Sequence, residues 1–211
     1  MARRVLHDEY FNKAKAEGYA ARSAYKLLQI NESRRILKKG DTVLDLGCAP
    51  GSWMQAASEI VGPKGRIVGI DLKEVRHAMP PNVTSIVGDI YDIDAARLLE
   101  LAGLTPPNQT SDAQGQGRGG FDVVMSDMAP NTTGHNEHEL SVRLCERILE
   151  LLPALLRPGG NMTMKVFEGG DYPRLLKDTA RLFNQCKGYK PKATRGVSRE
   201  MYIVGVGYKG N

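Results

Sequence analysis

The sequence predicts an α/β fold in which helices cover both faces of a mostly parallel, seven-stranded sheet with an antiparallel C-terminal hairpin. From residue 42 onward, short β-rich runs alternate with helical patterns, which is typical of βαβ units in a doubly wound sheet. The last two β-rich runs, at 192–195 and 201–208, leave no room for a helix between them. We therefore expect them to pair as a hairpin, which makes one strand antiparallel to the others.

The first 40 residues precede the sheet and are predicted to form a basic helical appendage. One helix is expected at 8–17 and a second after Ser23, whose side chain can cap a segment that carries several apolar residues. Residues 1–40 contain ten Lys or Arg residues and four Asp or Glu residues, whereas the whole chain has a formal charge of +5. The remainder of the chain is therefore close to neutral.

Strands and helices then alternate along the chain. The strands are predicted at 42–46, 66–70, 84–87, 121–126, 161–167, 192–195 and 201–208, and the helices at 52–61, 93–102, 139–156 and 172–186. Residues 103–120 are rich in Pro, Gly, Gln, Asn and Thr, which predicts a flexible loop. A chain of 211 residues, of which 41% are hydrophobic, can bury one sizeable core, so we expect one domain spanning 1–211.

Composition bears on the cellular compartment of the protein and on its binding partners. Three cysteines without CxxC spacing predict neither a disulfide framework nor a zinc site. We find no apolar leader and no apolar run that could span a bilayer, and we expect a cytoplasmic protein with no membrane partner, acting as a monomer. A second basic stretch, 187–199, contains no acidic residue. The two basic stretches would attract a polyanion if they share one face; otherwise they are ordinary solvated side chains.

The segment 43–53, Val-Leu-Asp-Leu-Gly-Cys-Ala-Pro-Gly-Ser-Trp, predicts a strand, a tight turn and a helix. Gly47 and Gly51 let the backbone turn sharply and approach a ligand, and the helix aims its positive end at that ligand. Asp71 ends the next strand, where its carboxylate can accept hydrogen bonds from ribose hydroxyls. These features fit NAD or S-adenosylmethionine, and the structural alternative is an ordinary βα turn with a helix-capping Asp71.

Two details of the turn favour S-adenosylmethionine over NAD. Pro50 removes an N–H group that would hold a pyrophosphate, and no third glycine completes a G-x-G-x-x-G pattern. A cofactor with a ribose and no phosphate therefore fits better, and Asp89, after the third strand, supplies a second carboxylate for the adenine amino group. Trp53 either packs on the cofactor or belongs to the core. Asp45 is expected to brace the turn.

Four polar residues in other segments are candidates for catalysis. Asp127 follows the strand 121–126, at the carboxyl edge where open α/β sheets bind ligands. Lys165 occupies an apolar strand, where a lysine is unusual and therefore suggests a functional role. The structural alternative is a lysine that protects the edge of a sheet. Lys26 and Glu200, taken singly, are ordinary solvated residues.

Five ordered segments resemble the FtsJ/RrmJ family of ribosomal RNA 2′-O-methyltransferases. They are 22–27 (Arg-Ser-Ala-Tyr-Lys-Leu), 45–53 (Asp-Leu-Gly-Cys-Ala-Pro-Gly-Ser-Trp), 126–131 (Ser-Asp-Met-Ala-Pro-Asn), 165–167 (Lys-Val-Phe) and 198–202 (Ser-Arg-Glu-Met-Tyr). The resemblance covers nearly the whole chain and implies a Rossmann-like class I methyltransferase fold. It implies that the catalytic residues are Lys26, Asp127, Lys165 and Glu200. It also implies that S-adenosylmethionine contacts Gly51, Trp53, Asp71, Asp89 and Asp127.

The resemblance also implies a substrate, and the chemistry of methyl transfer suggests a role for each catalytic residue. The segment 127–131 resembles the ribosomal branch of the family, so the expected target is a uridine ribose in large-subunit ribosomal RNA, with that RNA or the large subunit as partner. Lys165 is the expected base for the 2′-hydroxyl group, and Asp127 is expected to orient Lys165 and the sulfonium. Lys26 and Glu200 are expected to hold the ribose and the ammonium.

Other functions stay open at this point. The chain could methylate tRNA or another RNA, or act as a non-catalytic RNA-binding ribosome assembly factor. A nicotinamide-dependent oxidoreductase would share the cofactor turn, but it has no use for paired lysines with Asp and Glu. No metal is expected, since His135 and His138 lie on either side of Glu137 without a third ligand nearby.

Overall fold

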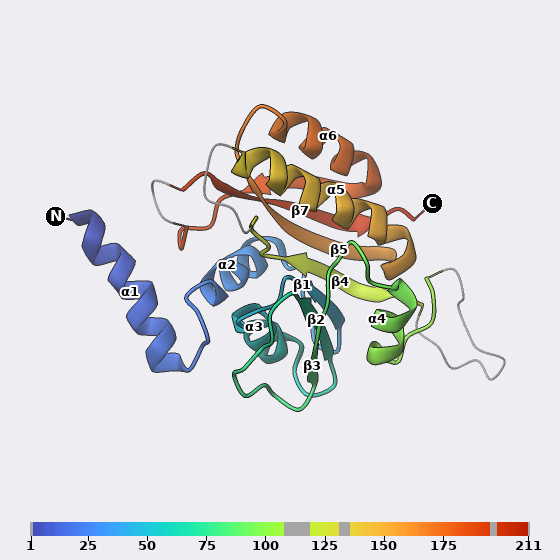
Figure 1. Ribbon diagram of the computed structural model, residues 1–211, viewed down its shortest axis with the longest axis horizontal. Helices are drawn as coiled ribbons and strands as arrows, with labels where there is room; N and C mark the ends of the chain where they lie inside the picture. The colour runs from blue at the N-terminus through green and yellow to red at the C-terminus, as the bar shows by residue number, and fades with distance from the viewer. Residues whose placement is uncertain (1, 108–118, 131–135, 195–197, 211) are drawn as a thin grey trace.

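The computed structural model describes residues 2–107, 119–130, 136–194 and 198–210. Its centre is a seven-stranded sheet with the strand order β3-β2-β1-β4-β5-β7-β6 (Figure 1). Strand β7 runs antiparallel to β5 and β6, and the other neighbours are parallel. The strands are β1 (Thr42–Leu46), β2 (Arg66–Asp71), β3 (Val83–Val87), β4 (Phe121–Ser126), β5 (Leu156–Phe167), β6 (Phe183–Tyr189) and β7 (Glu200–Tyr208). The predicted fold class is therefore confirmed.

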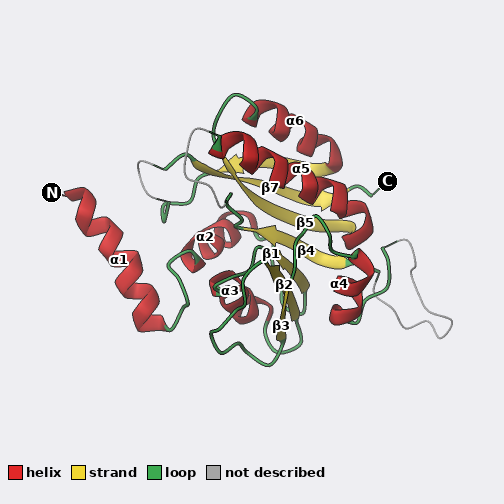
Figure 2. Ribbon diagram, in the orientation of Figure 1, coloured by secondary structure: helices red, strands yellow, loops and turns green. Residues whose placement is uncertain are grey.

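Helices cover both faces of this sheet (Figure 2). Those in the described residues are α1 (Ala2–Glu17), α2 (Ala24–Arg34), α3 (Ser52–Val61), α4 (Ala95–Ala102), α5 (Glu137–Leu155) and α6 (Tyr172–Leu182). Because successive side chains of a strand point to opposite faces, β1 contributes to two cores. Leu44 and Leu46 join the core under α4, α5 and α6, whereas Val43 joins the core under α2 and α3. None of the described helices combines the length and apolar character of a membrane span.

Helix α1 extends away from the sheet (Figure 1) and begins at Ala2, before the predicted start at residue 8. Near its C-terminal end, Ala14 packs in a small cluster with Tyr25 of α2 and Ala193. The expectation that Ser23 caps α2 through its side chain is wrong. Ser23 stands at the N-cap position, but its Oγ atom lies 2.8 Å from the Oγ atom of Ser52, at the start of α3, so the hydroxyl group links two helices instead.

The C-terminal hairpin is confirmed, but its first strand was predicted in the wrong place. Helix α6 ends at Leu182, and β6 occupies 183–189, where the sequence suggested a continued helix. The predicted strand at 192–195 is instead a turn as far as it is described, with the Thr194 N–H group donating to the carbonyl of Pro191. Pairing with β7 overrides the helical pattern, because an edge strand gains its ladder hydrogen bonds and packs Phe183 on Tyr208.

Other boundaries differ by a few residues from those predicted. Strand β5 starts at Leu156, earlier than the predicted residue 161, and α5 ends just before it. The predicted loop 103–120 begins at Gly103, which ends α4 in the left-handed conformation. Residues 108–118 of that loop lie outside the described residues.

Candidate active site

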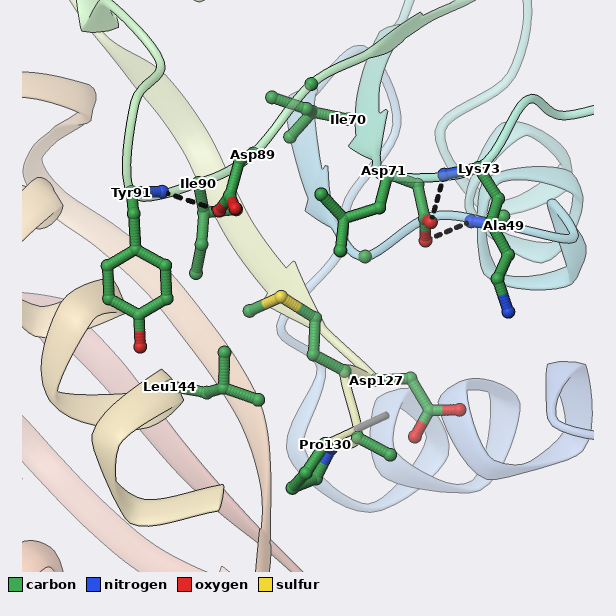
Figure 3. Close-up of a pocket in the computed structure, with 15 residues that line it drawn as sticks. Ala49, Ile70, Asp71, Lys73, Asp89, Ile90, Tyr91, Asp127, Pro130 and Leu144 are labelled. Carbon is green, nitrogen blue, oxygen red and sulfur yellow. Dashed lines mark hydrogen bonds between the residues drawn. The ribbon is translucent and has the colours of Figure 1, made fainter. Parts of the chain in front are cut away.

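A pocket of about 330 Å³ lies beside the carboxyl ends of β1, β2, β3 and β4 (Figure 3). Open α/β sheets bind ligands at this edge, because the loops that follow the parallel strands converge there. The lining comes from the turn after β1 (Gly47 and Ala49), the end of β2 (residues 70–73), the loop after β3 (88–91), the loop after β4 (127–130) and Leu144 of α5. The pocket is thus built from segments that are far apart in the sequence.

Two glycines give the turn between β1 and α3 its shape. Gly47 has a φ angle of 80° and Gly51 one of 111°, both in the left-handed region that favours glycine. A Cβ atom at Gly47 would collide with the side chain of Met128, and one at Gly51 with that of Met79. The turn therefore needs glycine at both positions to bring the backbone close to the pocket.

Asp71 and Asp89 bring two carboxylates to the pocket wall. The Asp71 carboxylate accepts a hydrogen bond from the Ala49 N–H group (3.0 Å) and another from the Lys73 N–H group (2.8 Å). The Asp89 carboxylate accepts one from the Tyr91 N–H group (2.9 Å). Figure 3 shows these bonds as dashed lines on opposite sides of the pocket. Each carboxylate is thereby held in place by backbone, with its remaining acceptor capacity free for a ligand.

Asp45 does not brace the turn as the sequence suggested. Asp71 makes the hydrogen bond to the turn, whereas neither carboxylate oxygen of Asp45 has a hydrogen-bond partner among the described residues. Complete burial raises the pKa of Asp45 well above its ordinary value, and the nearby charges of Asp127 and Asp71 raise it further. Burial therefore favours the uncharged form of this carboxyl group beneath the site.

Gly51 and Trp53, predicted to contact the cofactor, are not among the residues that line the pocket. Trp53 lies in the core under α2 and α3 with only 2% of its surface exposed. Its indole N–H group donates to the carbonyl of Ser23 (2.9 Å), and its ring stacks on that of Tyr202 with the ring centres 5.7 Å apart. Of the two interpretations of Trp53, the structure favours the core aromatic.

The four candidate catalytic residues form two ion pairs. Lys26 Nζ lies 2.8 Å from Glu200 Oε2, and Lys165 Nζ lies 3.1 Å from Asp127 Oδ1. Lys165 also donates to the backbone carbonyl of Asp127 (2.6 Å). Both lysine side chains are more than nine-tenths buried, with 9% and 7% of their surface exposed. A buried lysine costs free energy unless it is paired and hydrogen-bonded, and both conditions are met here.

Tyr202 joins the two ion pairs, a role that the sequence did not reveal. Its hydroxyl group donates to Asp127 Oδ1 (2.6 Å), and the Lys26 Nζ atom lies 5.9 Å from the centre of its ring. Burial raises the pKa of Tyr202 well above its ordinary value, with smaller contributions from the charges of Asp127 and Glu200. The hydroxyl group therefore stays protonated and remains a donor. The sequence signals were that Tyr202 lies in the segment 198–202 and that residues 200 and 202, two apart on one strand, share a face.

The register between β5 and β7 brings these residues together. Across the antiparallel pair, Lys165 lies opposite Tyr202 and Phe167 lies opposite Glu200. Asp127 directly follows β4, which pairs with β5 on its other side. Three neighbouring strands thus carry Asp127, Lys165 and Glu200, and α2 adds Lys26. Within the described residues, no group of three or more His, Cys, Asp or Glu side chains is arranged to hold a metal ion.

Comparison with known proteins places the chain in a family. Residues 19–208 match the family model of the FtsJ-like methyltransferases. A protein from Syntrophobacter fumaroxidans named ribosomal RNA large subunit methyltransferase E is 44% identical over 204 residues, covering 96% of this chain and 96% of that protein. A protein of the same name from Pseudomonas fluorescens is 37% identical over 211 residues, covering 99% of this chain and 93% of the relative.

A solved structure extends the comparison to the fold. A ribosomal RNA methyltransferase from Plasmodium falciparum superposes with a TM-score of 0.71 at 28% identity, covering 92% of this chain and 100% of that chain. The mostly parallel sheet with an antiparallel β7 is thus shared with a methyltransferase. The resemblance predicted from five sequence segments is confirmed, and the chain belongs to the FtsJ-like methyltransferase family.

Proposed function

We propose that this protein transfers a methyl group from S-adenosylmethionine to the 2′-oxygen of a ribose in large-subunit ribosomal RNA, with a uridine as the target nucleotide. One observation carries the proposal: Asp127 both lines the pocket and forms an ion pair with the buried Lys165. A base candidate therefore lies beside the wall of the pocket that would hold the methyl donor.

The pocket lining suits S-adenosylmethionine better than a dinucleotide. Its charged residues are three carboxylates, Asp71, Asp89 and Asp127, and a single lysine, Lys73. Carboxylates can accept hydrogen bonds from ribose hydroxyl and amino groups and attract a sulfonium, but they repel a pyrophosphate. Asp71 would bind the ribose hydroxyl groups of S-adenosylmethionine, and Asp89 would bind its adenine amino group. Asp127 would lie near its sulfonium. The cofactor, when bound, supplies an electrophilic methyl group.

The protein's part in the reaction is to hold the ribose and to take up one proton. The 2′-oxygen has to lose its proton as it accepts the methyl group, and Lys165 is placed to receive that proton once its ammonium group has released its own proton to water. The proton ends on Lys165 Nζ, where the Asp127 carboxylate and carbonyl stabilise the ammonium. Lys26, fixed by Glu200, would hold the ribose in line.

An RNA substrate is supported by the relatives and by the placement of basic residues. The curated relatives are named ribosomal RNA large subunit methyltransferases. The two basic stretches of the chain also meet, because Gln29 of α2 accepts a hydrogen bond from Tyr189 of β6 (3.3 Å) and another from the Ala193 N–H group (3.0 Å). Lysine and arginine side chains from both stretches can therefore act on one polyanion.

The test is transfer of a tritiated methyl group from S-adenosylmethionine to three RNA samples: undermethylated large ribosomal subunits, free large-subunit ribosomal RNA and tRNA. We expect label in ribosomal RNA, as subunits or free, and none in tRNA. Label in tRNA alone would favour the tRNA-modifying alternative. Absence of label in every sample, with intact RNA binding, would favour the non-catalytic assembly factor.

A further inference from the structure

The first turns of α5 hold the end of β5 through side chains that the proposed mechanism does not use. His138 Nδ1 lies 2.7 Å from the backbone oxygen of Phe167, the last residue of β5. Ser141 Oγ accepts a hydrogen bond from the Phe167 N–H group (3.1 Å) and donates to the carbonyl of His138 (2.7 Å). One turn further along α5, Cys145 Sγ donates to the carbonyl of Lys165 (3.1 Å). Both backbone polar groups of Phe167 are therefore held by α5.

The contacts of His138 define which ring nitrogen carries the proton. The carbonyl oxygen of Phe167 can only accept, so Nδ1 must carry a hydrogen atom. The backbone N–H group of Asp171 donates to Nε2 (3.2 Å), so Nε2 must be unprotonated. Of the two neutral tautomers, the Nδ1–H form satisfies both contacts, and the Asp171 carboxylate, with Oδ2 3.7 Å from Nε2, is the charged group facing the ring. With one ring, His138 thus ties the end of β5 to the turn that leads into α6.

The residues after β5 are shaped to receive this ring. A Cβ atom at Gly169 would lie 2.5 Å from His138 Cγ and 2.6 Å from Nδ1, closer than side chains approach each other. Glycine therefore allows the imidazole to lie against the backbone of the turn. His138 is also well shielded, with 20% of its side-chain surface exposed.

The strand end that His138 holds lies next to two of the proposed catalytic residues, one on β5 and one on β7. Lys165 lies two residues before Phe167, and Glu200 lies opposite Phe167 in the β5·β7 register. A shift of the Phe167 backbone would displace both side chains relative to the pocket. Misplacement of reacting groups by about 1 Å can cost about 100-fold in rate.

We propose that His138 is a positioning residue, which acts through Phe167 to fix Lys165 and Glu200 in their reactive geometry. This inference rests on the proposed function, because it takes Lys165 and Glu200 as catalytic. It deepens that function by assigning a task to a histidine at the start of α5 that neither lines the pocket nor belongs to the two ion pairs.

The first test compares kcat, the KM for RNA and the Kd for S-adenosylmethionine in four variants, after melting curves have shown that each is folded. His138→Ala is expected to lower kcat about 10-fold to 100-fold, with both affinities changed less than about 3-fold. His138→Asn, whose amide nitrogen takes the place of Nδ1, should recover most of the loss. His138→Gln, which reaches only the place of Nε2, should stay slow. The exposed His77, changed to Ala, is the control.

The second test does not depend on activity. Nitrogen NMR of protein labelled in its four histidines reports which ring nitrogen is protonated, and the His138→Asn spectrum identifies the signal of His138. At neutral pH we expect the Nδ1–H tautomer. An Nε2–H tautomer, or a folded His138→Ala variant with the wild-type kcat, would overturn the proposal. If the wild type methylates no RNA, the proposed function fails. The nitrogen spectrum still decides whether His138 holds the end of β5 through Nδ1–H.

Discussion

Asp127 is the residue on which the contacts of the candidate site converge. Its carboxylate accepts a hydrogen bond from Tyr202 and pairs with Lys165, its backbone carbonyl accepts from the same lysine, and it lines the pocket. In the proposed function, Asp127 therefore links the site of the methyl donor to the base. Variants that separate cofactor binding from proton transfer should therefore change either the pocket lining or Lys165, and leave Asp127 in place.

Variants of Asp71 test the proposed contact with S-adenosylmethionine. Replacing Asp71 by Ala should weaken S-adenosylmethionine binding about 10-fold to 100-fold, because it removes a charge-assisted ribose contact of about 1.5 to 3 kcal/mol. Asp71→Asn, which can still accept from the Ala49 N–H group but has no charge, should lie between the two proteins. Calorimetric titration gives all three affinities, and an unchanged affinity in Asp71→Ala would falsify the proposed cofactor pose.

Asp45 gives a prediction about pH and stability. Because burial raises its folded-state pKa above the unfolded value of about 3.9, the folded protein binds more protons over the interval between the two values. The contribution of Asp45 to stability therefore falls as pH rises through that interval. The free energy of unfolding of Asp45→Asn, relative to wild type, should increase with pH in urea titrations between pH 4 and 8. A pH-independent difference would show that Asp45 has an ordinary pKa.

The motifs picked out candidate residues, but they did not show which side chains these residues contact. Lys26, Asp127, Lys165 and Glu200 stood in recognisable segments, and the structure brings them together in pairs. Tyr202 and His138 could not be assigned. The partner of Tyr202 is 75 residues away in the sequence and that of His138 is 29, and neither sequence distance nor residue type reveals such contacts.

At the scale of elements, the turn between β1 and α3 links backbone shape to cofactor binding. Gly47→Ala should destabilise the protein and weaken S-adenosylmethionine binding, since a left-handed alanine costs about 1 to 2 kcal/mol and the collision with Met128 adds about 1 to 3 kcal/mol. Gly40→Ala is the matched control, with a φ angle of 82° and no atom within 4 Å of the position that a Cβ atom would take. Urea unfolding and calorimetry should show the backbone cost alone at Gly40. Equal losses at both glycines would contradict the collision.

Elements with their own hydrophobic pattern were predicted well, and the edge strand β6 was not. The buried strands β1, β2 and β4 and the turn after β1 follow from local sequence. Strand β6 was mistaken for the end of a helix, because most of its residues are polar or only partly buried and its stability comes from pairing with β7. Long-range pairing is the information that a local pattern lacks.

At the scale of the whole molecule, two elements far apart in the sequence, α2 and β7, meet at the candidate site. Helix α2 supplies Lys26, β7 supplies Glu200, and the turn after β6 packs on α2 through Ala193. The Arg34 guanidinium lies 5.9 Å from the ring centre of Tyr189, at the end of β6. The basic appendage predicted for residues 1–40 is therefore joined to the second basic stretch beside the site.

This arrangement predicts a salt-dependent RNA affinity. Replacing Arg34, Arg35, Lys38 and Lys39 by Gln should lower the slope of log affinity against log salt by about 1 to 3, at about 0.7 to 0.9 per lost phosphate contact. Cofactor affinity should not change. The charge-matched control replaces Lys64, Arg97, Lys177 and Arg181, outside the two basic stretches, by Gln. Parallel salt plots for wild type and the first variant would mean that these residues are only a solvated surface.

The most direct test of the account is the position of the transferred methyl group, compared between wild type and Lys165→Ala. A methyl group on the 2′-oxygen blocks alkaline cleavage of the neighbouring phosphodiester, because that cleavage needs a free 2′-hydroxyl group. After tritium transfer to undermethylated large subunits and alkaline hydrolysis, we expect the label in an alkali-stable dinucleotide that contains uridine. Lys165→Ala should produce nearly none, with cofactor affinity within a few-fold of wild type. Label in mononucleotides, as base methylation would give, or substantial activity in Lys165→Ala, would contradict the account.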